Sequence, residues 1–119
     1  MTERARDPDC LFCRIVAGEI PSDRVLEDDD VVAFRDVAPQ APTHVLVVPR
    51  RHVPDIDTLA DDEADLLAAL LAAVRRVAEH EGLAKGYRVV TNVGAEAGQS
   101  VFHLHLHVLG GRRMSWPPG

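Results

Sequence analysis

The chain has 119 residues, of which 46% are hydrophobic and 27% charged, and its formal net charge is −6. This composition is typical of one folded domain that buries ~65% of its unfolded surface, and the negative charge excludes broad nucleic-acid binding. No apolar run approaches the ~20 residues of a membrane span, and the N-terminus lacks a signal-peptide core, so we expect a cytoplasmic protein with no membrane attachment. We predict one domain over 1–119 with tails at 1–8 and 113–119.

The first half of the chain shows signals for a short helix followed by a hairpin. Asp9 is a candidate N-cap for a helix that runs to about Ala17 and is closed by Gly18. The segments Arg24–Glu27 and Val31–Phe34 flank a turn of three aspartates, which predicts two antiparallel strands.

The remaining elements are a buried strand, one long helix and two further strands. The β-branched run His44–Pro49 predicts the buried strand. Asp61–His80 is rich in alanine and leucine at helical spacing and meets Gly82, so it predicts the main helix. Tyr87–Asn92 and Val101–Leu109 complete the set. Because only one long helix is available for crossovers, we predict an α+β fold, with an antiparallel sheet of about five strands and one long and one short helix.

The most informative segment is the alternation of histidine with aliphatic residues in the last predicted strand. Successive strand side chains point to opposite faces, so His103, His105 and His107 are predicted to share one face. His105 and His107, with His44, could instead hold a catalytic metal with an open position, although no acid lies within or beside the motif. Three merely solvent-facing histidines are the least favoured interpretation, because chance rarely produces strict alternation.

Covalent chemistry at phosphorus is the favoured interpretation of the three histidines. A neutral imidazole is a good nucleophile near pH 7 and a good leaving group from phosphorus. His105 has an imidazole on each side, and these neighbours can hold its tautomer and donate to phosphoryl oxygens. The preceding loop contains glycines, whose backbone N–H groups can approach a phosphate, and the neutral donors Gln99 and Ser100. Such a loop allows an acidic protein to bind an anion.

Cys10 and Cys13 have the spacing of metal ligands and could direct two thiolates at one point. His52, just past the strand that ends at Pro49, and His103 could complete a Cys₂His₂ site. The same two cysteines could also be small buried side chains. A thioredoxin-like redox role is less favoured, because no parallel βαβ pattern surrounds the pair.

These residues carry a family resemblance that covers Cys10–Gly119. The run His103–Leu109 resembles the signature of the histidine triad (HIT) superfamily, and Phe34–Pro49 resembles the central strand region of that family. The segment Gly98–Arg112, together with the ending Trp116–Gly119, is similar to the Hint branch. Dinucleoside-polyphosphate hydrolases of the Fhit branch share the triad but not this ending.

The resemblance implies hydrolysis of purine nucleoside phosphoramidates or acyl nucleotides through a nucleotidyl-histidine intermediate. It implies that His105 attacks the α-phosphorus, that His107 and His44 contact the phosphate and manage protons, and that Ser100 binds the phosphate or the leaving nitrogen. The implied nucleotide-binding residues are Asp36 at the ribose, Asn92, Gly98 and Gln99 at the phosphate end, and Phe12, Ile15, Ile20, Phe34 and Val37 around the base. Each of the apolar residues could equally be a core residue.

The resemblance also implies a bacterial-type variant with one structural zinc ion per chain, held by Cys10, Cys13, His52 and His103. No metal is then required for the chemistry, because four protein ligands close the site. A homodimer formed through the long helix and a strand is implied as well, with a purine nucleotide as the small-molecule partner. Two other functions stay open: a nucleotide-binding regulatory module with incidental turnover, and a dinucleoside polyphosphate hydrolase.

Overall fold

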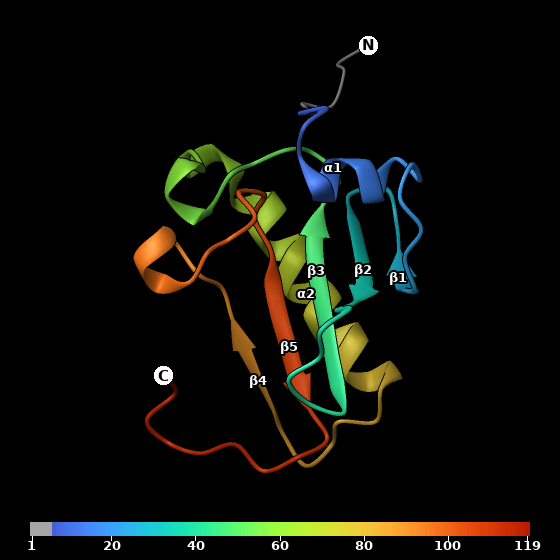
Figure 1. Ribbon diagram of the computed structural model, residues 1–119, viewed down its shortest axis with the longest axis vertical. Coiled ribbons are helices and arrows are strands. Elements are labelled where there is room, and N and C mark those ends of the chain that lie inside the picture. The colour runs from blue at the N-terminus through green and yellow to red at the C-terminus, as the bar shows by residue number, and fades with distance from the viewer. Residues whose placement is uncertain (1–5) are drawn as a thin grey trace.

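The computed structural model describes residues 6–119, so most of the predicted N-terminal tail lies outside the described residues. Over this range the chain forms a five-stranded antiparallel sheet in the order β1-β2-β3-β5-β4 (Figure 1). The strands are β1 (Arg24–Glu27), β2 (Val31–Arg35), β3 (Thr43–Pro49), β4 (Tyr87–Val90) and β5 (Leu106–Gly110), and the helices are α1 (Leu11–Val16) and α2 (Ala64–His80). Single 3₁₀ turns lie at Ile56–Thr58, Asp61–Glu63 and Ala95–Ala97. The predicted α+β class, with one long and one short helix, is confirmed.

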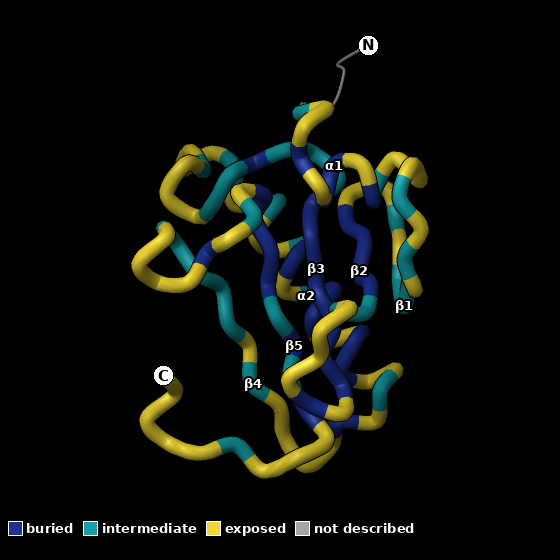
Figure 2. Tube along the Cα trace, in the orientation of Figure 1, coloured by how far each residue is buried: buried dark blue, intermediate teal, exposed yellow. Residues whose placement is uncertain are grey.

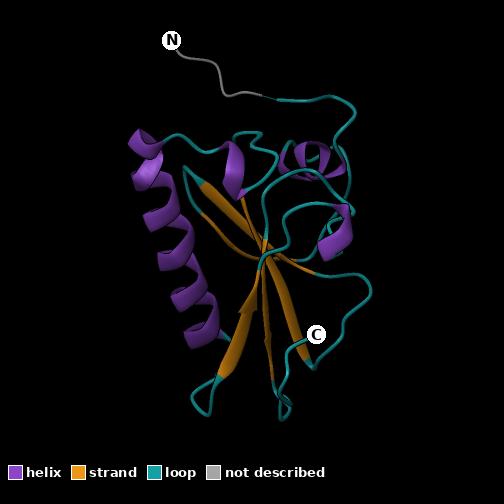
Figure 3. Cartoon of the chain, turned by 90° about the vertical axis from the view of Figure 1, so that its left-hand side faces the viewer, coloured by secondary structure: helices purple, strands orange, loops and turns teal. Residues whose placement is uncertain are grey.

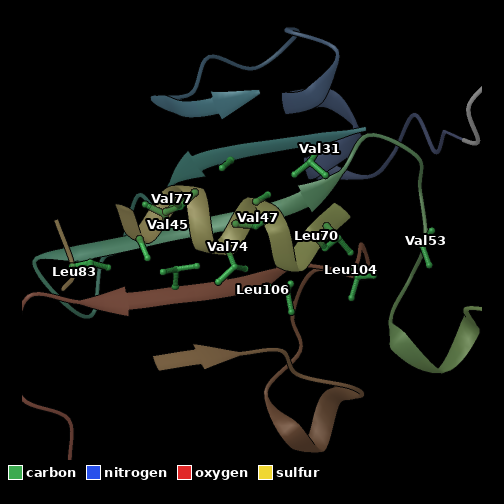
Figure 4. Close-up of a cluster of buried hydrophobic side chains, with 14 residues drawn as sticks. Val31, Val45, Val47, Val53, Leu70, Val74, Val77, Leu83, Leu104 and Leu106 are labelled. Atoms are coloured by element: carbon green, nitrogen blue, oxygen red, sulfur yellow. The ribbon is translucent and has the colours of Figure 1, made fainter. Parts of the chain in front are cut away.

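The long helix α2 covers one face of the sheet (Figure 3). Alternate residues of a strand point to opposite faces, so Val45 and Val47 of β3 and Val108 of β5 all face α2. They form a buried cluster with Leu70 and Val77 of the helix (Figure 4). Each such aliphatic side chain contributes roughly 1.5–3 kcal/mol by leaving water. The part of the chain from residue 6 onward contains no helix long and apolar enough to cross a bilayer.

The opposite face of the sheet packs against α1 and carries the histidines. Phe34 of β2 and Leu46 of β3 form a second buried cluster there with Phe12 of α1. The rings of Phe12 and Phe34 meet edge to face with their centroids 5.5 Å apart. His107 of β5 lies on this face because it pairs directly with Leu46. Figure 2 shows β2 and β3 buried along most of their length, so this face is a rigid platform.

The predicted strand Val101–Leu109 is wrong in its first half. β5 begins at Leu106, so His103 and His105 precede the strand instead of lying within it. Pairing with β3 stops here because Pro49, the last residue of β3, has no N–H to donate. The three histidines therefore do not share one strand, and contacts made by their rings and main chain keep them together.

Smaller corrections concern the ends of other elements. Cys10, not Asp9, is the N-cap of α1, and its sulfur accepts from a backbone N–H of the first turn. β4 ends at Val90, two residues early, where the Thr91 hydroxyl donates to the carbonyl of His105 at 2.8 Å in place of a main-chain pair. α2 starts three residues late, after a 3₁₀ turn.

The assignment of the whole chain to one domain with two tails stays a prediction. Within the predicted C-terminal tail, the Ser115 carbonyl accepts from the guanidinium of Arg88 on β4 at 2.7 Å. This contact attaches part of the tail to the edge of the sheet.

Candidate functional site

A cavity of about 600 Å³ opens on the histidine face of the sheet. A volume of this size is typical of small-molecule sites, and the walls combine an apolar region with a polar end. It is lined by every residue predicted around the base and by four predicted polar residues: Phe12, Ile15, Ile20, Phe34, Val37, Asp36, Ser100, His105 and His107. Val37 lies at the rim, where its side chain is fully exposed.

The main chain fixes the tautomer of His105. Its Nδ1 lies 2.7 Å from the carbonyl oxygen of His103. A carbonyl oxygen can only accept, so Nδ1 carries the hydrogen and Nε2 keeps its lone pair. Burial lowers the pKa of His105, so the ring is neutral at pH 7. His105 therefore presents a bare nitrogen in the cavity, the form that can attack an electrophile.

A second chain of hydrogen bonds fixes His107 in the opposite sense. The backbone N–H of Gln40 donates to Nδ1 of His44 at 3.0 Å, and burial lowers the pKa of His44, so the single hydrogen of its neutral ring is on Nε2. That Nε2–H donates to Nδ1 of His107 at 2.9 Å. The neutral ring of His107 consequently carries its own hydrogen on Nε2. His107 is thus a hydrogen-bond donor, and its ring centroid lies 4.9 Å from that of His105.

A carboxylate also lies beside the histidines, although no acid occurs near the triad in the sequence. One oxygen of Asp36 accepts from the backbone N–H of Ala38 at 2.8 Å. The other lies 3.4 Å from Nε2 of His44 and opposes the lowering of its pKa by burial. The fold brings this acid to the site from the end of β2, so its negative charge can stabilise a proton on the His44–His107 pair.

The second cluster predicted from the sequence is also assembled by the fold. Cys10, Cys13, His52 and His103 bring their ligand atoms within 4.8 Å of one another. The Sγ atom of Cys13 lies 3.3 Å from Nδ1 of His52 and 3.5 Å from Nδ1 of His103. Tetrahedral zinc with bonds of about 2.3 Å to sulfur and 2.0 Å to nitrogen would separate these atoms by roughly 3.6 Å. This cluster is therefore able to hold a metal ion.

The hydrogen bonds of His103 support this role. Its Nε2 lies 2.8 Å from the carbonyl oxygen of Pro49, so Nε2 carries the hydrogen and Nδ1 offers its lone pair to the cluster. Ligating histidines almost always donate from the second nitrogen in this manner. Burial lowers the pKa of His103 to about 4, which keeps the ring neutral and ready to coordinate.

A second group of possible ligands fails the same test. Asp36, His44 and His107 lie close enough to share an ion. However, Nδ1 of His44 accepts a hydrogen bond from the N–H of Gln40, so its Nε2 bears the hydrogen and has no lone pair to offer. A metal bound to Nε2 of His44 would move the ring hydrogen to Nδ1, where it would face the N–H of Gln40, so two donors would oppose each other. The arrangement disfavours a catalytic metal, and it does not gather the set His44, His105 and His107 that the sequence suggested as the alternative.

Three predicted nucleotide-binding residues do not line the cavity: Asn92, Gly98 and Gln99. The amide of Gln99 is buried and is used by the fold: it accepts from Gly94 of its own loop at 2.9 Å and donates to Pro54, in the segment after β3, at 2.8 Å. Several lining residues were missed, among them Leu11, Pro21, Ser22, Asp23, Arg35, Leu46 and Val101. Their only signal was proximity in the chain to residues that were predicted.

The pKa of His107 predicts how stability depends on pH. Burial, with the neighbouring His105 and His44, lowers the pKa of His107 from its ordinary value near 6.5 to about 4. Between these values the unfolded chain binds a proton that the folded chain does not, so the free energy of unfolding falls as pH drops through this window. Urea unfolding from about pH 7 to about pH 4 should show this loss. A His107→Gln variant should show a shallower dependence, and an equally steep one would contradict the assignment.

Comparison with known proteins places the chain in a family. The HIT domain family model matches residues 17–114, and the chain belongs to that family. An uncharacterized HIT-like protein of Synechococcus elongatus is 50% identical over 111 residues, which cover 93% of this chain and 97% of that protein. The solved structure of a HIT family hydrolase from Legionella pneumophila is 52% identical with a TM-score of 0.91, covering 93% of this chain and all of the other. A HIT family hydrolase from Clostridium thermocellum is 44% identical with a TM-score of 0.89, covering 92% and 96%.

Proposed function

We propose that this protein is a hydrolase that cleaves purine nucleoside phosphoramidates or acyl nucleotides through a nucleotidyl-histidine intermediate. Two similar solved proteins are named HIT family hydrolases, which supports hydrolysis at the coarse level. One observation carries the mechanism: the 2.7 Å hydrogen bond from Nδ1 of His105 to the His103 carbonyl leaves Nε2 unprotonated in the cavity. A nitrogen held in this way is prepared to attack phosphorus.

The reaction proceeds in two displacements at the same phosphorus. Nε2 of His105 forms a bond to the α-phosphorus while the bond to the leaving nitrogen or acyl oxygen breaks, and a leaving amine nitrogen takes one proton from solvent water. A second water then attacks the phosphorus and gives one proton back to the solvent, while the bond to Nε2 of His105 breaks to release the nucleoside monophosphate and the neutral imidazole. His107 donates from Nε2 to a phosphoryl oxygen in both steps, which stabilises the charge that develops there.

The remaining walls fit a nucleoside. The apolar region around Phe12, Ile15 and Phe34 can enclose a purine base, since aromatic and aliphatic side chains pack against its faces. Asp36 follows Phe34 and precedes His44 in the sequence, and it lines the same cavity. Its carboxylate can accept from the ribose hydroxyls. Each of its oxygens has two lone pairs, so the existing bond from Ala38 leaves acceptor capacity free. Ser100 lines the same cavity, and its hydroxyl is proposed to bind the phosphate or the leaving nitrogen.

We also propose that the ion held by the Cys₂His₂ cluster is Zn²⁺. Two thiolates and two imidazoles are the donors that zinc prefers in closed tetrahedral sites. Cys10 and Cys13 come from the start of α1, whereas His52 and His103 come from segments that follow β3 and precede β5. An ion there joins the N-terminal helix to the sheet and supplies folding energy. It leaves no open position for substrate.

We propose that two chains associate through β4 and α2. β4 is an edge strand with unpaired main-chain groups, and its Tyr87 and Val89 are exposed. Val89 pairs with Val108, a residue of the α2 face, so Tyr87 and Val89 lie on the α2 side of the sheet, and α2 itself exposes Leu67 and Leu71. This combination of an open edge and exposed apolar residues is suited to a second copy of the chain.

The proposed dimer is tested by a substitution that places a charged side chain in the middle of the edge strand β4. A Val89→Lys variant should sediment with the mass of one chain, whereas the wild type sediments with twice that mass. The matched control is Ile56→Lys, which places the same charge at another exposed apolar residue outside the proposed interface. A wild-type protein of single-chain mass at micromolar concentration would refute the proposal.

The activity is tested with a fluorogenic adenosine phosphoramidate, and the alternatives are tested beside it. Turnover of this compound, together with slow or absent turnover of a diadenosine polyphosphate, supports the proposed reaction. The opposite preference would instead identify a dinucleoside polyphosphate hydrolase. Micromolar binding of AMP without turnover of either compound would identify a nucleotide-binding module.

A further inference from the structure

The loop that joins β2 to β3, residues 36–42, is built as a frame around one backbone amide. The N–H of Asp36 donates to the His44 carbonyl at 2.9 Å, which closes the loop at its base. The side-chain amide of Gln40 donates to the Ala38 carbonyl at 3.0 Å. These bonds turn the backbone N–H of Gln40 toward Nδ1 of His44, the contact from which the tautomers of His44 and His107 follow.

The chain that leaves β5 contacts this loop from outside (Figure 1). Nε of Arg112 donates to the Gln40 carbonyl at 3.1 Å, and Nη1 of the same guanidinium donates to the carbonyl of Arg113. Gly111 lies against the loop with φ of +87°, and a Cβ there would approach Pro42 to 3.0 Å. Two consecutive residues thus pack on the loop, one by close main-chain approach and one by a charge-assisted hydrogen bond.

We propose that Arg112 is a positioning residue for the His44–His107 pair. By holding the carbonyl of Gln40, it holds that residue with its N–H directed at Nδ1 of His44. This role is separate from the binding of substrate, because Arg112 does not line the cavity. Its kinetic consequence rests on the proposed function, whereas its effect on the tautomers does not.

The consequence follows from the direction of each hydrogen bond. Without the donor from Gln40, Nδ1 of His44 is free to carry the hydrogen, and Nε2 then becomes an acceptor. His107 would answer by carrying its hydrogen on Nδ1, which leaves its Nε2 without a hydrogen. The donor to the phosphoryl oxygen would then be lost while the walls of the nucleotide cavity stay in place, so kcat is affected more than KM.

A pair of matched substitutions isolates this hydrogen bond. Arg112→Met keeps a long side chain but removes the donor. Arg112→Gln restores an N–H the same number of bonds from Cα as Nε of arginine, without the charge. Arg113→Met is the control, because Arg113 contributes only its carbonyl to this network. We expect Arg112→Met to lower kcat about fivefold with KM little changed, Arg112→Gln to recover most of that loss, and Arg113→Met to match the wild type.

The tautomers are read directly from the imidazole ¹⁵N shifts in the uniformly labelled protein. The wild type and Arg112→Gln should show His107 with its hydrogen on Nε2, and Arg112→Met should show a mixture of both forms. An unchanged His107 tautomer in Arg112→Met would overturn the proposal, whatever the kinetics. If no variant, including the wild type, turns over the phosphoramidate, the proposed function fails, and the shifts still decide the role of Arg112.

Discussion

Replacing His105 with alanine is expected to lower the turnover of an adenosine phosphoramidate by roughly 10⁴-fold or more, since it removes the attacking atom. The other polar groups of the site are held by hydrogen bonds that do not involve this ring: Gln40 holds His44, His44 holds His107, and Ala38 holds Asp36. Binding of AMP should therefore change little. The measurement is kcat with the fluorogenic substrate, beside the Kd for AMP by calorimetry.

The control for this substitution is His80→Ala. It removes an exposed histidine at the end of α2 that does not line the cavity. Rapid quenching of the wild type followed by mass spectrometry should show a peptide containing His105 with the added mass of a nucleotidyl group. Equal rates for the wild type and His105→Ala would refute covalent attack by this residue. A rate loss without any adduct in the wild type would point to a single direct displacement by water.

Removal of the proposed zinc ion is expected to have the largest effect on stability. A strong chelator, or a His52→Ala substitution, should lower Tm by about 10 °C or more, because an ion held by four side chains contributes several kcal/mol to folding. His52 is half-buried and lies outside the cavity wall, so its loss reports on the metal and not on substrate contacts. Thermal unfolding with chelator, and again after Zn²⁺ is restored, gives the measurement.

Activity measured in the same samples separates a structural from a catalytic ion. Activity should decline with the folded population, and His80→Ala should respond to the chelator as the wild type does. Activity that vanishes while Tm is unchanged would assign the ion to the chemistry and contradict the structural role. A Tm that responds neither to the chelator nor to His52→Ala would show that no ion stabilises the fold.

Much of this architecture could be predicted because side-chain pattern determines it. The helical spacing of leucine and valine in residues 61–80 and the β-branched run of β3 read directly as buried elements, and both are confirmed. Nine predicted residues line the cavity, and they came from the HIT resemblance, which transfers by position; their roles stay a prediction. The cysteine spacing alone left a metal site and two buried side chains as alternatives, and the HIT resemblance favoured the metal site that the cluster is able to form.

The contacts that could not be predicted are hydrogen bonds of main-chain groups, because the backbone carbonyl and amide are chemically the same at almost every residue. Nothing in the sequence distinguishes the carbonyl of His103 or the amide of Gln40, yet these two groups set the tautomers of His105 and His44. The early start of β5 has a different origin: Pro49 is visible in the sequence, but the register that places it beside the residues preceding β5 is not. Gln99 shows the converse: the sequence suggests its amide as a phosphate donor, but the fold uses that amide to hold its loop and to join the loop to Pro54.

His103 belongs to two clusters at once, through different atoms. Its ring belongs to the cysteine cluster, and its carbonyl oxygen orients the ring of His105. On the two proposals made above, a change in how the ring of His103 is held by the cysteine cluster would also move the carbonyl oxygen that orients the ring of His105. The proposed metal site and the proposed nucleophile are therefore coupled through one residue. The proposed hydrolysis would then report whether the N-terminal helix is correctly attached to the sheet.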